Sequence, residues 1–417
     1  MQGKGKSKFR KILSGCMTLL LIISLIACFW GLCNVYGMLT GQEEMVDTLK
    51  QALTELEVDS EAQESAYEAR AAELEEQVKM LEAQTEEALR EKEALLEEIA
   101  VLTDPGNGIA AYGQLSVKDG TLMSEAGETV VLKGMSSHGL NWYPKYTNAG
   151  AMATLKEYGA NVFRIAMYPG QNDGYIVAPK QNKTYLYMAV ENVLSQDMYV
   201  IVDWHVLREE SPLVYKEEAK DFFEEISAQY AGNEGIIYEI CNEPNGATSW
   251  EEVVEYANEI IPIIRENSPE AVIIVGTPEF CTDLEVAMES PLQYDNIMYA
   301  YHKYVDVSKD SKLGVNSLQK AIEAHFPVFV SEWGISYGDL DDSNIKDWED
   351  PALIFDKAYE FVEGMERNNI SWCGWSLSNK AEAYSMILKS CDKLSGWTKE
   401  DMTPSGWLMM QALKREE

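Results

Sequence analysis

The sequence predicts an α/β protein whose main domain is a (β/α)8 TIM barrel, and three observations support this. A turn-forming stretch at residues 103–108 separates an acidic N-terminal region from about 310 residues that form a single domain. Within that domain, eight short apolar runs rich in β-formers alternate with helical patterns. Nearly every run ends in a polar or aromatic residue, and active sites of this fold lie at the carboxyl ends of the strands.

Composition and charge exclude several classes of protein. The chain has 417 residues, of which 69 are acidic and 34 basic, so its formal net charge is −35. This balance argues against a nucleic-acid-binding protein, which needs a basic surface to displace counterions from phosphate. The seven cysteines are scattered and show no CxxC spacing, so the sequence implies neither a zinc knuckle nor a disulfide scaffold.

The N-terminus has the pattern of a membrane anchor. Residues 1–11 form a basic tail, and residues 12–42 carry no charge and hold enough apolar residues to span a bilayer. Basic residues before this run and acidic residues after it predict a single-pass segment with a cytoplasmic N-terminus and an extracellular remainder. Two alternatives also export the chain: a lipoprotein anchored at Cys28, which follows the lipobox-like Leu25-Ile26-Ala27, and a secreted protein with a cleaved signal peptide.

Residues 43–102 predict a long acidic helix that resembles a coiled coil. The segment has no Gly or Pro and carries 19 acidic and 5 basic residues. We expect one continuous helix from Val46 to Leu102, which acts as a spacer between the membrane and the barrel and can form a homo-oligomer. The alternative is a single solvated helix that does not self-associate. Apolar or small residues recur at spacings of three and four, at Val46, Leu49, Leu53, Leu56, Leu74, Val78, Leu81, Ala88, Leu95, Ile99 and Leu102.

The barrel domain, residues 103–417, begins with a predicted small hairpin. Its arms are Leu115–Val117 and Thr129–Leu132, which flank Asp119-Gly120 and Ala126-Gly127. Apolar runs such as Tyr199-Val200-Ile201-Val202 are expected of parallel strands buried on both sides. The eight predicted barrel strands are Val131–His138, Asn161–Tyr168, Tyr199–His205, Ile236–Glu243, Val272–Gly276, Asn296–His302, Pro327–Trp333 and Ser371–Leu377.

The ends of these strands hold the candidate functional residues. Three of the chain's four histidines lie there. Glu243 and Glu332 end the fourth and seventh strands, on opposite sides of the barrel mouth. Two such carboxyl groups fit glycoside hydrolysis, in which one protonates the leaving oxygen and the other attacks or activates water. The residues at the strand ends are His138, Arg164, His205, Asn242, Glu243, His302, Tyr304, Glu332 and Trp375.

Six segments at these strand ends resemble glycoside hydrolase family 5, most closely its bacterial endo-β-1,4-glucanases. The resemblance extends from about Tyr112 to Leu413, and the six motifs occur in the family's order. The segments are KGMSSHGLNW at 133–142, NVFR at 161–164, DWH at 203–205, NEP at 242–244, MYAYHKY at 298–304 and SEWG at 331–334.

The resemblance implies a retaining double displacement without a metal or cofactor. Glu243 would be the acid/base and Glu332 the nucleophile that forms a glycosyl-enzyme intermediate. Glu243 should then have a raised pKa, and Arg164 should lower that of Glu332. Asn242 would bind the sugar 2-hydroxyl. Tyr304 would donate to the nucleophile, with His302 beside it.

The resemblance also implies a set of sugar-binding residues. Trp375 would be the stacking platform at the cleavage subsite, because sugar C–H faces pack on aromatic rings. The other residues that it implies for the substrate are His138, Trp142, Tyr168, His205, Lys380 and Glu382.

The leading interpretation is therefore a membrane-anchored extracellular endo-β-1,4-glucanase. The same mechanism on mannan or mixed-linkage β-glucan is the nearest alternative. A metal-dependent barrel hydrolase would need clustered ligands such as His-x-His on the first strand, where His138 stands alone. An inactive cell-surface glycan-binding protein is disfavoured because both carboxylates and Arg164 are present.

Overall fold

The computed structural model describes residues 44–52, 64–103, 106–306, 317–336 and 351–414. The chain divides into two compact units, Met1–Pro105 and Gly106–Glu417. The sequence-based boundary between spacer and barrel is residue 103, and the helix that ends the first unit also ends there. The predicted tail and anchor, residues 1–42, lie outside the described residues. Of the helices that the structure describes, none combines the length and the apolar character needed to cross a bilayer.

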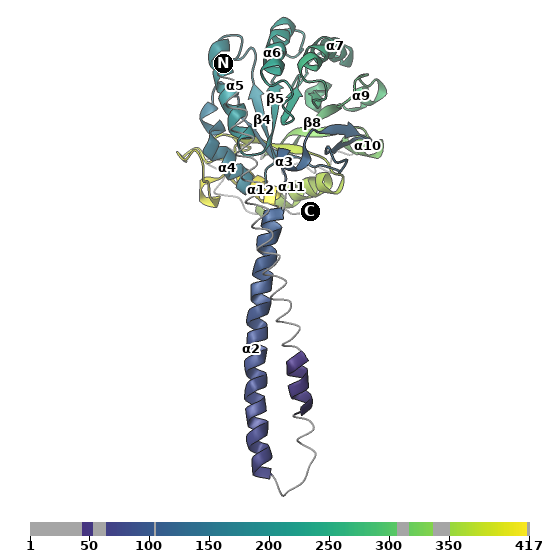
Figure 1. Ribbon diagram of the computed structural model, residues 1–417. Helices are drawn as coiled ribbons and strands as arrows, with labels where there is room; N and C mark the ends of the chain where they lie inside the picture. The colour runs from purple at the N-terminus through teal and green to yellow at the C-terminus, as the bar shows by residue number, and fades with distance from the viewer. Residues whose placement is uncertain (1–43, 53–63, 104–105, 307–316, 337–350, 415–417) are drawn as a thin grey trace, which may run out of the picture. The chain divides into compact units, whose positions relative to one another are not determined.

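The first unit contains the helix α2, Glu64–Thr103, and a shorter helix at residues 44–52 (Figure 1). Lys50 Nζ lies 3.1 Å from a carboxylate oxygen of Glu82. In one continuous helix these residues would be roughly 48 Å apart at 1.5 Å per residue. The expected uninterrupted helix from Val46 to Leu102 is therefore wrong, because the shorter helix lies beside α2.

Part of the predicted seam is buried in this unit. Leu74, Leu81 and Ala88 follow one another at intervals of seven residues, and each is less than 9% exposed. Val46 of the shorter helix is buried as well. The heptad spacing thus produces one apolar stripe along α2. Self-association through this stripe remains a prediction.

The second unit is the predicted (β/α)8 barrel. Its eight strands are all parallel and close in the order β10-β3-β4-β5-β6-β7-β8-β9. The strands are β3 Lys133–Ser137, β4 Val162–Met167, β5 Tyr199–Trp204, β6 Ile236–Glu239, β7 Ile273–Val275, β8 Ile297–Asp306, β9 Val328–Ser336 and β10 Trp372–Leu377.

Helices surround the barrel (Figure 1), and the largest cluster of buried apolar side chains fills the space between them and the strands. Some of the helices begin with clear signals; in α7, Ser249 and Glu252 form a reciprocal capping box. The helices are α3 Ile109–Tyr112, η1 Pro144–Thr147, α4 Ala149–Glu157, α5 Pro179–Leu194, α6 Lys216–Gln229, α7 Trp250–Asn267, α8 Pro278–Cys281, α9 Glu285–Glu289, α10 Ser317–Glu323, α11 Pro351–Arg367, η3 Lys399–Asp401 and α12 Pro404–Lys414.

The barrel interior is layered by strand alternation. Successive residues of a strand point to opposite sides. On β4, Val162 belongs to the inner apolar cluster and Phe163 to the outer one, so Arg164 points inward again. The same alternation turns Asp203 on β5 and Glu239 on β6 toward the barrel axis. A charged layer therefore lies directly above the apolar floor.

Strand β9 contains a bulge that places two consecutive residues in the interior. The pairing of β9 with β8 shifts by one residue between Ala300 and His302, and its pairing with β10 shifts beside it. Phe329 before the bulge faces the inner cluster, and Trp333 after it faces the outer one. Ser331 and Glu332, which lie between them, both reach hydrogen-bond partners inside the barrel. A bulge re-aims side chains in this way.

The predicted hairpin is correct in its first arm and wrong in its second. β1 Ser116–Lys118 pairs with β2 Thr121–Met123, while Thr129 makes only an isolated bridge to Met123. Asp119 and Gly120 both have positive φ, so they form a two-residue turn that returns the chain at once. The hairpin's apolar residues pack with the bottom of the barrel interior.

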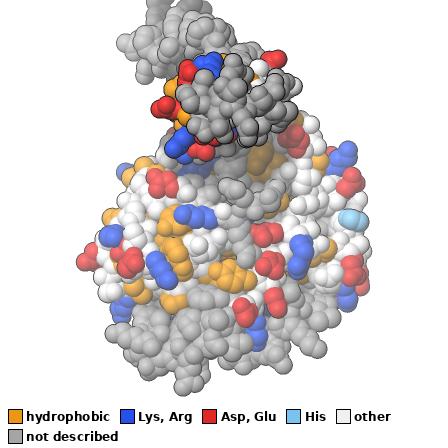
Figure 2. All heavy atoms as spheres, turned by 90° about the horizontal axis from the view of Figure 1, so that it is seen from below, with side chains coloured by type: hydrophobic (Ala, Val, Ile, Leu, Met, Phe, Trp, Pro, Cys, Tyr) orange, Lys and Arg blue, Asp and Glu red, His pale blue; other side chains and the backbone are white. Residues whose placement is uncertain are grey.

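Figure 2 shows one face of the structure, on which basic and acidic side chains are interspersed with scattered hydrophobic ones. No continuous basic area appears among the coloured residues of this view. The distribution agrees with the exclusion of a nucleic-acid-binding surface from net charge.

We predict that Asn161→Ala will destabilise the barrel by about 2 to 4 kcal/mol, because it removes one buried side chain that bonds to two backbone groups. The Asn161 side chain accepts from the Lys133 N–H at 2.7 Å and donates to the Val131 carbonyl at 3.0 Å, where β3 begins. Urea unfolding followed by tryptophan fluorescence measures the change. Asn258→Ala, at an exposed position of α7, is the matched control and should change stability by less than about 0.5 kcal/mol. Equal effects of the two substitutions would contradict the assignment.

Candidate active site

Arg164 lies at the centre of the charged layer and is fully buried. Its guanidinium forms a two-point contact with Glu239, with Nε–Oε2 at 2.6 Å and Nη2–Oε1 at 3.2 Å. It also lies 3.0 Å from a carboxylate oxygen of Asp203. Nη2 donates to Asn242 Oδ1 at 2.6 Å, and Nη1 donates to Glu332 Oε2 at 3.3 Å. One cation therefore positions four groups from the ends of three other strands, β5, β6 and β9.

Glu332 accepts hydrogen bonds on both carboxylate oxygens. Arg164 donates to Oε2, and the Tyr304 hydroxyl donates to Oε1 at 2.5 Å. Donors that bond to a carboxylate favour its ionised form. The structure thus brings together the three residues that the sequence assigned to the nucleophile and its support.

Glu243 contacts a different kind of neighbour. Its Oε1 lies 2.7 Å from Nδ1 of His302, whose other ring nitrogen lies 3.0 Å from the Ser331 hydroxyl. Ser331 in turn donates to Glu239 at 2.8 Å. Burial lowers the pKa of His302 to about 4, so its ring is neutral near pH 7.

The two carboxyl groups lie close together. One carboxylate oxygen of Glu243 and one of Glu332 are within 4.8 Å of each other. Retaining glycosidases hold their pair about 5 to 5.5 Å apart, whereas inverting enzymes leave roughly 6.5 to 9.5 Å for a water. The separation therefore favours direct nucleophilic attack.

Burial raises the pKa of both carboxyl groups to about 7. The neighbouring Glu239 adds to the rise at Glu243, and Glu243 adds to the rise at Glu332. For Glu332, the charges of His302 and Arg164 and the Tyr304 hydrogen bond act in the opposite direction but do not outweigh burial. The raised pKa expected for Glu243 is confirmed. The lowered pKa expected for Glu332 is wrong in its net direction, because desolvation exceeds the effect of Arg164.

The same residues also have the composition of a metal site. Donor atoms of Glu243, His302 and Glu332 all lie within 4.8 Å of one another. Both ring nitrogens of His302 and both oxygens of Glu332 already have hydrogen-bond partners. This arrangement suits proton transfer and nucleophilic attack, and we assign the cluster to that chemistry.

Aromatic rings form one wall of a cavity of about 290 Å³ above the carboxyl pair. Trp375 stacks on His205 with ring centroids 5.2 Å apart and an angle of 14° between the planes. Tyr168 packs against His205 at 4.2 Å. Trp142 is 39% exposed and lies 4.9 Å from the Tyr168 ring, so it extends the aromatic surface toward solvent.

The polar side of the cavity contains His138, Lys380 and Glu382. Lys380 Nζ lies 3.1 Å from Nε2 of His138 and forms an ion pair with Glu382 at 2.5 Å. Burial and then the charge of Lys380 lower the pKa of His138 to about 3, so this ring is neutral. The Gly139 N–H donates to Nδ1 of His138 at 2.6 Å, so the neutral ring carries its proton on Nε2. The ion pair of Lys380 and Glu382 offers both donors and acceptors to sugar hydroxyls.

Several site residues were missed by the sequence analysis. Asp203, Glu239 and Ser331 are fully buried partners of the network, but each lies inside its strand as the sequence predicted it rather than at the end. The signal that could have found them is the charged residue itself, since an ionisable side chain in a buried strand needs a partner. The Tyr384 ring lies 5.1 Å from that of Tyr304 and also lines the cavity.

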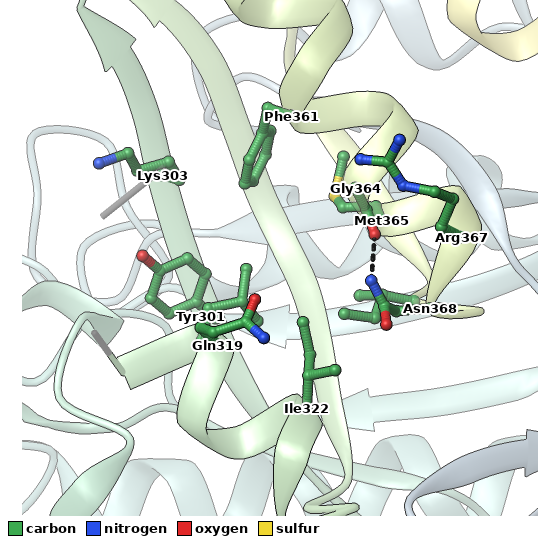
Figure 3. Close-up of a pocket in the computed structure, with 11 residues that line it drawn as sticks. Tyr301, Lys303, Gln319, Ile322, Phe361, Gly364, Met365, Arg367 and Asn368 are labelled. Carbon is green, nitrogen blue, oxygen red and sulfur yellow. Dashed lines mark hydrogen bonds between the residues drawn. The ribbon is translucent and has the colours of Figure 1, made fainter. Parts of the chain in front are cut away.

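A second cavity, of about 280 Å³, lies on the outer side of the barrel between β8, α10 and α11 (Figure 3). Tyr301, Ile322 and Phe361 face it, and Asn368 donates to the Gly364 carbonyl at 2.7 Å. No carboxylate is among its lining residues, so it offers no acid/base pair.

Comparison with known proteins identifies the family. Residues 123–381 match the model of the cellulase family, glycosyl hydrolase family 5. Endoglucanase A of Butyrivibrio fibrisolvens is 43% identical over 306 residues, which are 72% of this chain and 68% of that protein. An endoglucanase of Clostridium saccharobutylicum is 39% identical over 303 residues, 72% of this chain and 65% of the relative.

Solved structures agree in sequence and fold. The catalytic domain of a Thermobifida fusca endoglucanase, in complex with cellotetraose, is 30% identical and superimposes with a TM-score of 0.66 over 74% of this chain and 100% of that one. The catalytic domain of alkaline cellulase K gives 31% identity and a TM-score of 0.64, covering 74% and 96% of the two chains. The resemblance expected from the six motifs is confirmed: the chain belongs to glycosyl hydrolase family 5, the cellulase family, and is a glycoside hydrolase of a retaining type.

Proposed function

We propose that the chain is an endo-β-1,4-glucanase in which Glu243 is the acid/base and Glu332 the nucleophile. The main support for this proposal is that the two carboxyl groups lie within 4.8 Å of each other and have different hydrogen-bond partners. The two relatives above are named endoglucanases, and one similar structure holds cellotetraose. These names support β-1,4-glucan as the substrate.

In the first step, Glu332 attacks the anomeric carbon while the proton of Glu243 moves to the leaving oxygen. The glycosidic bond breaks, and a glycosyl ester forms on Glu332. Arg164 and Tyr304 neutralise and orient the attacking carboxylate. In the second step, Glu243 takes a proton from water, whose oxygen attacks the same carbon and releases Glu332.

The cavity walls give the substrate its orientation. A glucose ring can stack on Trp375, while His138, Lys380 and Glu382 bond hydroxyl groups of the next ring. Asn242 keeps one amide proton available for the 2-hydroxyl, because its Oδ1 accepts from Arg164 and one N–H donates to the Val206 carbonyl. Mannan and mixed-linkage β-glucan remain the alternative substrates for the same mechanism.

We predict that Glu243→Gln and Glu332→Gln will each reduce hydrolysis of carboxymethylcellulose and barley β-glucan by at least about 1000-fold, because each removes a group that bonds to the reacting atoms. Reducing ends are measured on these glucans, on mannan and on xylan. Glu289→Gln, an exposed control on α9, should retain full activity.

The nucleophile can be observed directly. Mass spectrometry of Glu243→Gln with an activated 2-fluoro-cellobioside should find the sugar on Glu332. Label on another residue, or none, would contradict the assignment. Release of reducing ends from mannan alone would support the same mechanism with mannan, in place of β-1,4-glucan, as the substrate.

We predict a bell-shaped pH dependence of kcat/KM. Activity requires ionised Glu332 and protonated Glu243, so it falls as pH drops through the lower apparent pKa of the pair and falls again as pH rises through the upper one.

Tyr304→Phe removes a donor to the Glu332 carboxylate and therefore raises the pKa of Glu332. The acidic limb should move to higher pH, and kcat should fall about 10- to 100-fold. An unmoved acidic limb would contradict this role of Tyr304.

We also propose that residues 12–42 anchor the enzyme to the cell membrane and that the barrel is extracellular, on the basis of the sequence pattern alone. The full chain should stay in the membrane fraction after an alkaline carbonate wash, and protease added to intact cells should degrade the barrel. Cys28→Ser serves as the matched variant: unchanged anchoring supports a transmembrane segment, and release supports the lipoprotein alternative. A wild-type chain found only in the medium would overturn both.

Sedimentation of the full chain with and without residues 43–102 tests the proposed oligomer.

A further inference from the structure

Ser331 lies beside the proposed nucleophile inside the barrel. It points inward by regular alternation from Phe329, and the bulge in β9 turns Glu332 inward as well. The Ser331 hydroxyl, fully buried, lies 3.0 Å from Nε2 of His302 and 2.8 Å from Oε1 of Glu239. Nδ1 of the same histidine lies 2.7 Å from Oε1 of Glu243. An unbroken line of hydrogen bonds therefore connects the proposed acid/base to the arginine cluster.

The direction of these hydrogen bonds follows from the available donors. Glu239 accepts from two guanidinium nitrogens of Arg164, a geometry that holds it as an acceptor-only carboxylate against the effect of burial. The Ser331 proton must then point to Glu239, which leaves the Ser331 oxygen to accept from Nε2–H of His302.

A neutral imidazole carries one proton. With that proton on Nε2, Nδ1 of His302 is a bare acceptor, and the hydrogen bond to Glu243 must be donated by the carboxyl group of Glu243. The line of bonds thus places the acid proton on the oxygen nearest His302.

We infer that Ser331 is a positioning residue, which fixes His302 as the Nε2–H tautomer and so keeps the acid proton on Glu243. This inference rests on the proposed role of Glu243 as acid/base. It has a consequence for the second step: once Glu243 has given up its proton, its carboxylate faces the lone pair of Nδ1. That contact is unfavourable until the proton returns, which favours removal of a proton from the attacking water.

Other ionisable groups face the same two residues, and they stay unchanged when Ser331 alone is substituted. A change of tautomer or pH profile in such a variant can therefore be assigned to the lost hydroxyl. The groups are Tyr168 and Arg164 from β4 and the loop after it, Asp203 and His205 at the end of β5, Glu239 on β6, Cys281 on α8, Tyr304 on β8, Glu332 on β9, and Tyr384 after β10.

The tautomer is measured without reference to activity. The chain has four histidines, so ¹⁵N-histidine labelling gives few signals, and the signal lost in His302→Asn is that of His302. In the wild-type chain we expect a protonated Nε2 and a bare Nδ1. In Ser331→Ala we expect a mixture of tautomers, and Ser331→Thr, which keeps the hydroxyl, should restore the wild-type pattern.

The activity of the same variants provides a second readout. In Ser331→Ala, part of the His302 population donates from Nδ1 to ionised Glu243, which lowers the pKa of Glu243. The basic limb of kcat/KM should move to lower pH by about one unit, with the acidic limb nearly unchanged. Ser371→Ala is the matched control: its buried hydroxyl only accepts from the Leu132 N–H, so it should lower stability without moving either limb.

Each outcome decides the inference. A bare Nε2 in the wild-type chain overturns it, even if Ser331→Ala does not fold. Lost activity in Ser331→Ala with unchanged tautomer and pH limbs also overturns it, because a merely structural role would give that result. A wild-type chain without activity on any glycan would refute the proposed function, and the tautomer measurement would still decide the role of Ser331.

Discussion

The buried guanidinium of Arg164 is the interaction on which the rest of the site depends. A cation in the interior of a barrel requires compensation by nearby acceptors. Here Asp203, Glu239 and Glu332 contact it directly, and Glu243 lies just beyond. Four buried carboxyl groups surround one positive charge, and the pKa of each is raised. With a pKa raised to about 7, Glu243 can hold a proton near neutral pH, as acid catalysis requires.

Strand geometry determines which residues can join this cluster. Alternation alone turns Arg164, Asp203 and Glu239 inward. Asp203 and Glu239 pair directly across β5 and β6, and Arg164 pairs with Ile201, two residues before Asp203. The nucleophile is the exception. A regular β9 would direct Ser331 and Glu332 to opposite sides of the sheet, and only the bulge brings both into the interior.

The sequence predicted the barrel and most of the site because both follow from local patterns. Each barrel strand was found, since a strand buried on both sides is apolar and its end is polar. Buried network residues such as Glu239 were missed, because an isolated polar residue within an apolar run gives no indication of its partner. The fold-back of residues 44–52 along α2 was also missed, because heptad spacing describes a contact face and not the partner that covers it.

The sequence also does not reveal how far burial shifts the pKa values of the two catalytic carboxyl groups. Their surroundings explain how two groups of the same type acquire different roles. The expected pairing with Arg164 suggested a lowered pKa for Glu332, yet burial raises the pKa of Glu332 and Glu243 alike to about 7. Burial therefore cannot distinguish the acid from the nucleophile. The distinction lies in the hydrogen-bond partners: the Tyr304 hydroxyl can only stabilise charge on Glu332, whereas a bare Nδ1 of His302 can only stabilise the proton on Glu243. On this reasoning, the polarity of two hydrogen bonds assigns the two chemical roles.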